Sequence, residues 1–102
     1  MIKGRMQTWL CPDVNIYHDL QDKRVIAEVS LPGVSKKDIM LEAGQEGFCV
    51  KARRKDAYYD SCFRFDERVD TRSTRAEFDN GLLKLTAPVS KEAFHARKIT
   101  LS

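Results

Sequence analysis

Residues 76–88 read AEFDNGLLKLTAP, and this stretch decides the fold class. Its Asp79-Asn80-Gly81 turn separates two short runs, 75–78 and 82–87, in which apolar and polar residues alternate. Asn-Gly is the strongest short hairpin signal, because both residues tolerate a positive φ. Alternation with a period of two is typical of a strand with one buried face. The stretch therefore predicts an antiparallel β-hairpin near the end of the chain.

The same alternation recurs toward the N-terminus. Further strand-like runs cover 14–17, 24–31, 39–43, 48–53 and 62–65, with turn-forming residues between them. Residues 35–38 predict one helical turn capped by Ser35, the charged stretch 66–74 predicts a loop, and 91–95 favour a helix. Short strands with frequent turn signals indicate an all-β antiparallel sandwich. The 102 residues suffice for a single domain.

Composition limits the partners that we expect. The net charge of +3 is too small to indicate nucleic acid, and the dense run Lys51-Ala52-Arg53-Arg54-Lys55 is interpreted as a solvated strand end rather than a phosphate-binding patch. No run approaches the roughly 20 apolar residues that span a bilayer. The N-terminus lacks the apolar core of a signal peptide. We therefore expect a cytoplasmic protein without nucleic-acid or membrane partners.

The cysteines support the same location. The chain has an odd number of cysteines, Cys11, Cys49 and Cys62, and they form no CxxC motif. We therefore predict free thiols that pack as small hydrophobes. The two histidines, His18 and His95, are remote from any cysteine pair, which disfavours a zinc site.

No catalytic motif occurs in the sequence. It contains no Gly-rich phosphate loop, no GxSxG, no HExxH and no dinucleotide fingerprint. Asp13, His18 and Asp19 are close in sequence, but a role in turns explains the two aspartates better than catalysis. We expect a protein that is not an enzyme, needs no cofactor, and acts by binding alone.

Three motifs, taken in order, resemble the α-crystallin domain of small heat-shock proteins. The first is Leu31-Pro32-Gly33-Val34 followed by Lys37-Asp38-Ile39. The second is Phe63-x-Phe65 followed by Val69-Asp70, although residues 66–68 lack the family's proline. The third is the family signature Ala76-x-x-x-Asn80-Gly81-x-Leu83, with Pro88 after the strand.

This resemblance implies an immunoglobulin-like β-sandwich at 12–89, with an N-terminal arm at 1–11 and a C-terminal extension at 90–102. It implies an ATP-independent holdase that binds partly unfolded client proteins, suppresses their aggregation in stress, and self-associates as a dimer or small oligomer. The alternative is a CS-type co-chaperone that binds a specific partner chaperone. That class lacks the Asn-Gly signature hairpin and the apolar tail described next.

The tail Ile99-Thr100-Leu101 resembles the family's C-terminal docking motif. By that resemblance the receiving groove consists of Leu41 and Ala43 on one strand and Ala76 and Phe78 on another. Alternation also permits Ile39, which we expect to be core. Docking into another chain is the favoured interpretation, and self-docking, an added edge strand or disorder are the alternatives.

Two departures from the family limit what the resemblance implies. The connection at 54–61 is too short for the exchanged strand of many members, so the dimer mode stays open. The N-terminal arm is brief, and its apolar residues Met6, Trp9 and Leu10 are the candidates for client contact. Packing of these residues against the sandwich is an equal alternative. We expect assemblies smaller than the family's large shells.

Overall fold

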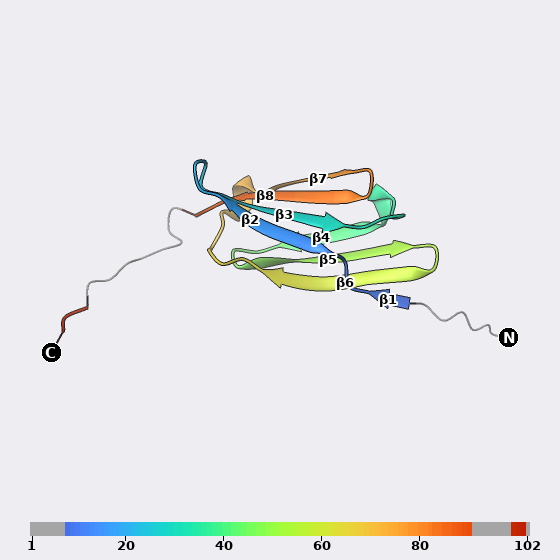
Figure 1. The fold of residues 1–102 in the computed structure, drawn as a ribbon, viewed down its shortest axis with the longest axis horizontal. Helices are drawn as coiled ribbons and strands as arrows, with labels where there is room; N and C mark the ends of the chain where they lie inside the picture. Colours follow the sequence, from blue (N-terminus) through green and yellow to red (C-terminus); the bar gives the residue numbers. More distant parts are fainter. Residues whose placement is uncertain (1–7, 91–98, 102) are drawn as a thin grey trace.

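The structure, a computed structural model, describes residues 8–90 and 99–101 of the chain. Two four-stranded sheets form the two layers visible in Figure 1. One sheet has the order β1-β6-β5-β4, formed by β1 (Thr8–Leu10), β4 (Ile39–Ala43), β5 (Gly47–Arg54) and β6 (Ala57–Arg64). The other has the order β2-β3-β8-β7, formed by β2 (Val14–Asp19), β3 (Arg24–Ser30), β7 (Arg75–Asp79) and β8 (Leu82–Pro88). The predicted immunoglobulin-like β-sandwich is confirmed.

Alternation along the strands builds the core between the sheets. In β5, for example, Phe48, Val50 and Ala52 are buried, whereas the residues between them are half-buried or exposed. All neighbouring strands are antiparallel except β1 and β6, which are parallel. The core cluster comprises Val25, Ala27, Val29, Leu31, Val34, Phe48, Val50, Ala52, Tyr59, Phe65, Val69, Leu83, Leu85 and Ala87.

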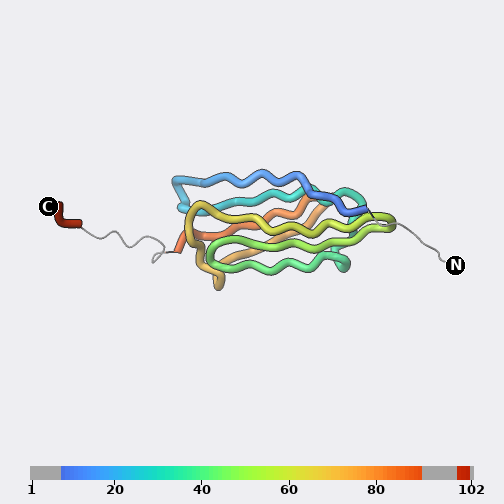
Figure 2. The backbone as a smooth tube through the Cα atoms, turned by 90° about the horizontal axis from the view of Figure 1, so that it is seen from below, coloured from blue at the N-terminus to red at the C-terminus, as the bar shows by residue number. Residues whose placement is uncertain are grey.

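The connectivity fixes which edges of the two sheets lie together. β1 and β2 are the outermost strands at one end of each sheet order, and only residues 11–13 join them. A link this short holds both strands at the same side of the sandwich. β4 and β7 are therefore the edge strands of the opposite side, and Figure 2 shows β2 and β4 along opposite sides of the molecule.

Two of the three sequence motifs meet in space. The β7–β8 turn has φ of 50° at Asn80 and 80° at Gly81, as a type I′ hairpin turn requires. The Gly81 carbonyl accepts a hydrogen bond from the Leu31 N–H at 2.7 Å, so the turn docks on the chain that leaves β3. That chain turns at Gly33, whose φ is 81°. The signature hairpin thus holds the β3–β4 connection against the sandwich.

The remaining motif closes one end of the core. The ring centroids of Phe63 and Phe65 lie 5.2 and 5.6 Å from that of Phe48. Val69 is completely buried and forms an isolated bridge with Val89. Asp70 accepts a hydrogen bond from the Arg72 N–H at 3.0 Å and caps the 3-10 turn η2 (Thr71–Ser73). The loop predicted at 66–74 is thus anchored at both Val69 and Asp70.

Three of the secondary-structure elements differ from the sequence predictions. Residues 8–10, assigned to the N-terminal arm, form β1 and extend the first sheet. β6 begins at Ala57 rather than Cys62, because Lys55-Asp56 is a two-residue hairpin turn. Ser35 precedes the 3-10 turn η1 (Lys36–Asp38) without a side-chain cap, since its backbone carbonyl accepts the Asp38 N–H instead. The helix predicted at 91–95 lies outside the described residues.

Candidate functional site

The predicted docking groove lies at the edge shared by β4 and β7. Leu41 of β4 and Phe78 of β7 are half-buried and pack against the core. Ala43 and Ala76, the other predicted groove residues, are exposed. Ile39, expected to be core, is half-buried like Leu41. The edge therefore presents a row of apolar side chains that the sandwich covers only in part.

The backbone of this edge has the chemistry to receive an extended segment. β4 and β7 are outermost in their sheets, so one side of each strand pairs with no other strand of the described chain. Unpaired N–H and C=O groups at a sheet edge can pair with an added strand. In such a segment, side chains at positions i and i+2 point to the same side. The half-buried apolar row would then contact two side chains of a single tripeptide.

The tail carries such a tripeptide. Ile99 and Leu101 are 82% and 91% exposed, and Thr100 between them is exposed as well. Neither apolar side chain fills the groove of its own chain in this structure. The two exposed side chains are therefore free to contact another molecule.

The arm residues have different surroundings. Trp9 is 67% exposed and its ring stacks on that of Tyr58, with a centroid separation of 5.2 Å. Leu10 is half-buried and packs against the core. Met6 lies outside the described residues. Of the three candidates for client contact, Trp9 thus presents most of its surface to solvent and Leu10 is partly taken up by the sandwich.

The β5–β6 connection is even shorter than the sequence indicated. The turn at Lys55-Asp56 joins the two strands directly, and β5 and β6 pair from Arg54↔Ala57 to Gly47↔Arg64. No exchanged strand fits in a two-residue turn. β1 covers the outer edge of β6 only at 57–59, so the edge beyond Tyr59 pairs with no strand of the described chain. The first half of β6 was not predicted because the Lys55-Asp56 turn contains neither Gly nor Asn.

The prediction of three free, buried thiols is wrong. Cys49 of β5 and Cys62 of β6 are directly opposite each other and form a disulfide, while Cys11 is free and exposed. Because Phe48 and Val50 point into the core, Cys49 between them points to the outer face. Alternation along β6 places Cys62 on the same face, where it is exposed.

A hairpin turn predicted at Lys55-Asp56 would have placed Cys49 opposite Cys62. Cys49 lies six residues before Lys55, and Cys62 lies six residues after Asp56, so a hairpin centred on that turn places them opposite each other. Starting the second strand at Cys62 hid the register. The cysteines consequently no longer support a cytoplasmic location, which stays a prediction.

The titratable residues near β2 hold a turn together. The Asp19 carboxylate accepts hydrogen bonds from the N–H groups of Gln21 and Asp22 and from the Arg24 guanidinium at 2.8 Å. The Arg24 hydrogen bond is the main reason why the pKa of Asp19 is lowered. The turn role predicted for Asp19 is confirmed. His18 Nε2 lies 3.5 Å from a carboxylate oxygen of Glu67.

This cluster does not resemble a catalytic or metal site. Asp19 is engaged by Arg24, and its partners are turn groups rather than His18. Within 8–90 and 99–101, no group of three or more His, Cys, Asp or Glu side chains could hold a metal ion. In the same part of the chain no helix is long and apolar enough to span a membrane.

Solved structures similar to this one are small heat-shock proteins. Heat shock protein 16.0 from Schizosaccharomyces pombe matches with a TM-score of 0.73 at 18% identity, over 97% of this chain and 80% of that one. HSP18.5 from E. histolytica matches with a TM-score of 0.71 at 11% identity, over 88% and 99% of the two chains. A small heat-shock protein from Xylella fastidiosa, described as having a distinct high order structure, matches with a TM-score of 0.65 at 18% identity, over 89% and 95%.

No protein-family model and no curated protein sequence matches the chain. At identities this low, the structural likeness shows the fold. The chain has the α-crystallin-domain sandwich of small heat-shock proteins, as its three motifs predicted.

Proposed function

We propose that this chain, which has the α-crystallin fold, is an ATP-independent holdase that binds partly unfolded clients and suppresses their aggregation. The observation that carries the proposal is the match to a small heat-shock protein over 97% of the chain at a TM-score of 0.73. The match includes the edge strands and the signature hairpin rather than an isolated motif. Holding a client needs no covalent step, so the proposed activity requires no catalytic residue or cofactor.

The surface of the sandwich supports this activity physically. A partly unfolded client exposes apolar side chains and unpaired strand edges. The chain offers partners for both: the exposed ring of Trp9 near the N-terminus, and the half-buried apolar row at the β4 and β7 edges. Apolar burial contributes roughly 25 cal/mol per Å² and is indifferent to sequence, which suits a binder of many clients.

The same edge is the proposed receiver for the tail of another copy. In this arrangement Ile99 and Leu101 contact Leu41 and Phe78 of a neighbour. Eleven positions separate Pro88 from Ile99, so the connector can span at most about 36 Å when extended. The high order structure of the Xylella fastidiosa protein gives a precedent for assembly on this fold. Self-association and client binding would then compete for one apolar edge.

Holdase activity is tested by heating a model client that aggregates, with and without the full chain and without nucleotide. We expect light scattering to fall as the chain approaches and exceeds the client concentration. Full aggregation of the client at several-fold excess of the chain would contradict the proposal and favour the alternative of a CS-type co-chaperone.

Tail docking is tested by the mass of the chain in solution, measured by multi-angle light scattering. The variant Ile99→Ala/Leu101→Ala is expected to shift the population to smaller species. Thr100→Ala is the matched control, because its side chain points away from the proposed groove. An unchanged mass in the double variant would count against docking.

A further inference from the structure

We propose that the outer face of the first sheet binds single-stranded nucleic acid. Bases would stack on Trp9 and Tyr58, and phosphates would lie against the basic residues around the β5–β6 turn. The small net charge predicted no such partner, but net charge does not show where charges gather. The fold brings aromatic and basic side chains from distant parts of the sequence onto one face.

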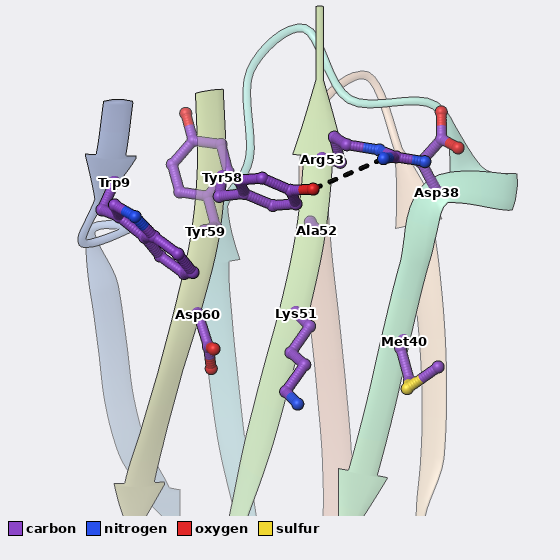
Figure 3. Close-up of a pocket in the computed structure, with 9 residues that line it drawn as sticks. All are labelled: Trp9, Asp38, Met40, Lys51, Ala52, Arg53, Tyr58, Tyr59 and Asp60. Carbon is purple, nitrogen blue, oxygen red and sulfur yellow. Dashed lines mark hydrogen bonds between the residues drawn. The ribbon is translucent and has the colours of Figure 1, made fainter. Parts of the chain in front are cut away.

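An aromatic platform lies at one end of this face. The rings of Trp9 and Tyr58 stack with 24° between their planes, and Trp9 exposes two thirds of its surface. They line a shallow cavity of about 530 Å³, with Met40, itself 61% exposed, at its far side. Figure 3 shows these side chains spread across β1, β6 and β4. Base stacking on such a platform is strong and tolerant of sequence.

A cation extends the platform. The Arg53 guanidinium carbon lies 5.8 Å from the Tyr58 ring centroid, and its NH1 group donates a hydrogen bond to the Tyr58 hydroxyl at 3.4 Å. Figure 3 shows Arg53 continuing the row that begins at Trp9 and Tyr58. A planar guanidinium can stack on a base and bond a phosphate. Arg53 therefore links the proposed stacking surface to the proposed phosphate site.

A basic cavity of about 470 Å³ adjoins the first and shares Arg53 and Asp38 with it. Its basic side chains come from two segments: Lys37 precedes β4, while Arg53 and Arg54 end β5 and Lys55 begins the β5–β6 turn. Within the described residues, Lys37, Arg53 and Lys55 form no ion pair with a carboxylate. These three unneutralised cations are the proposed phosphate contacts.

Arg54 has a different part in this cavity. Its NH1 group donates to the Pro32 carbonyl at 3.0 Å, and its Nε lies 3.5 Å from a carboxylate oxygen of Asp56. These contacts hold the side chain in place and partly neutralise it. Arg54 is therefore a structural neighbour of the site rather than a phosphate contact.

Acidic residues decide where the phosphates lie. Five basic and two acidic side chains line the two cavities together, a net charge of +3. Asp60 is directly opposite Lys51 in the ladder and offsets its charge at the centre of the face. The charge that Asp60 does not offset thus lies around Lys37, Arg53 and Lys55, where Asp38 is the acidic side chain that lines both cavities. Removing the Asp60 charge should strengthen binding, which a purely structural role would not predict.

The arrangement favours single strands over duplexes. Bases inside a duplex are stacked on one another and cannot stack on Trp9 and Tyr58, whereas those of a single strand are free to do so. Trp9 is the only tryptophan of the chain, so base stacking should quench the intrinsic fluorescence. A polyanion that has no bases would leave this signal unchanged.

The test uses the full chain and a labelled oligouridylate of about twelve nucleotides. We expect tryptophan quenching and an anisotropy increase at low salt. With three phosphate contacts, the plot of log K against log salt should have a slope of about −2. A duplex of the same length should bind more weakly, and heparin should not quench Trp9.

Matched variants separate stacking from charge. Tyr58→Leu should weaken binding about five-fold or more, whereas Tyr17→Leu, at an exposed tyrosine of the other sheet, should not. Lys55→Gln should make the slope of log K against log salt shallower by about 0.7, whereas Lys84→Gln on β8 should leave this slope unchanged. Asp60→Asn should tighten binding. Trp9 is left intact, because it is also the proposed client contact.

Three results would overturn the proposal. The first is no quenching of tryptophan fluorescence by the oligouridylate at low salt, and the second is a duplex or heparin that binds as tightly as the oligouridylate. The third is a Tyr58→Leu variant that is folded by circular dichroism and binds the oligouridylate as tightly as the wild type. The second would show charge attraction only. If Tyr58→Leu fails to fold, unaltered affinities in both Lys55→Gln and Asp60→Asn would still decide against the site.

Discussion

The substitution Gly81→Ala tests how the signature hairpin stabilises the sandwich. Gly81 has a φ of 80°, in the left-handed region, and its carbonyl accepts the Leu31 N–H. An added Cβ would lie 3.4 Å from the Pro32 Cα, an ordinary contact, so steric overlap contributes little. The cost is then the left-handed backbone itself, about 1–2 kcal/mol for a residue with a side chain.

This loss is measured by urea and thermal denaturation followed by circular dichroism. For a domain of this size the expected drop in melting temperature is roughly 4–16 °C. Gly44→Ala is the matched control, since its φ is not in the left-handed region and the nearest atom to an added Cβ is 4.0 Å away. Wild-type stability in Gly81→Ala, or an equal loss in Gly44→Ala, would show that the left-handed backbone at residue 81 does not determine the cost.

Three further predictions concern stability. Gly47→Ala should lose more than Gly81→Ala, because its added Cβ would overlap the backbone of β6, and the same denaturation series measures this. Reducing the Cys49–Cys62 disulfide should cost about 3 kcal/mol by the closed-loop relation; a reductant that leaves the denaturation midpoint unchanged would contradict it. Arg24 lowers the pKa of Asp19, so the stabilisation from this pair should be present above the unfolded-state pKa and disappear as pH falls through the folded-state pKa. Asp19→Asn should accordingly be less stable than the wild type at neutral pH and equal to it in strong acid.

The sequence predicted the fold well where local chemistry decides it. The Asn-Gly turn and the alternation on either side identified β7 and β8, and the register confirms the pairing from Arg75↔Thr86 to Asp79↔Leu82. The turn at Gly33 was likewise marked by its own residues. Such elements are determined by residues that are adjacent in the sequence, so the sequence alone is enough to predict them.

The elements that were missed carry little local signal. β1 has only three residues, and what makes it a strand is parallel pairing with residues 57–59. The first half of β6 points Ala57, Tyr59 and Ser61 inward, so its alternation has little apolar contrast. The Cys49–Cys62 pair followed from the same missed register. Neither propensity nor period contains this information.

The candidate site was predicted in part for the same reason. The family resemblance named Leu41 and Phe78 as groove residues, and both are half-buried on edge strands, whereas the groove itself stays a prediction. That β4 and β7 are the edge strands follows from the order of both sheets, which alternation does not specify. The aromatic and basic face required still more: Lys37, Trp9 and Tyr58 come together only through tertiary structure.

Holdase activity is measured most plainly by the fate of a heated client on a sizing column. A client that is heated with the full chain in the absence of nucleotide should remain soluble and elute together with the chain at a mass larger than either protein alone. Such co-elution shows that the client is held, which reduced light scattering alone does not. A client that is recovered in the pellet, or that stays soluble but elutes apart from the chain, would contradict the account.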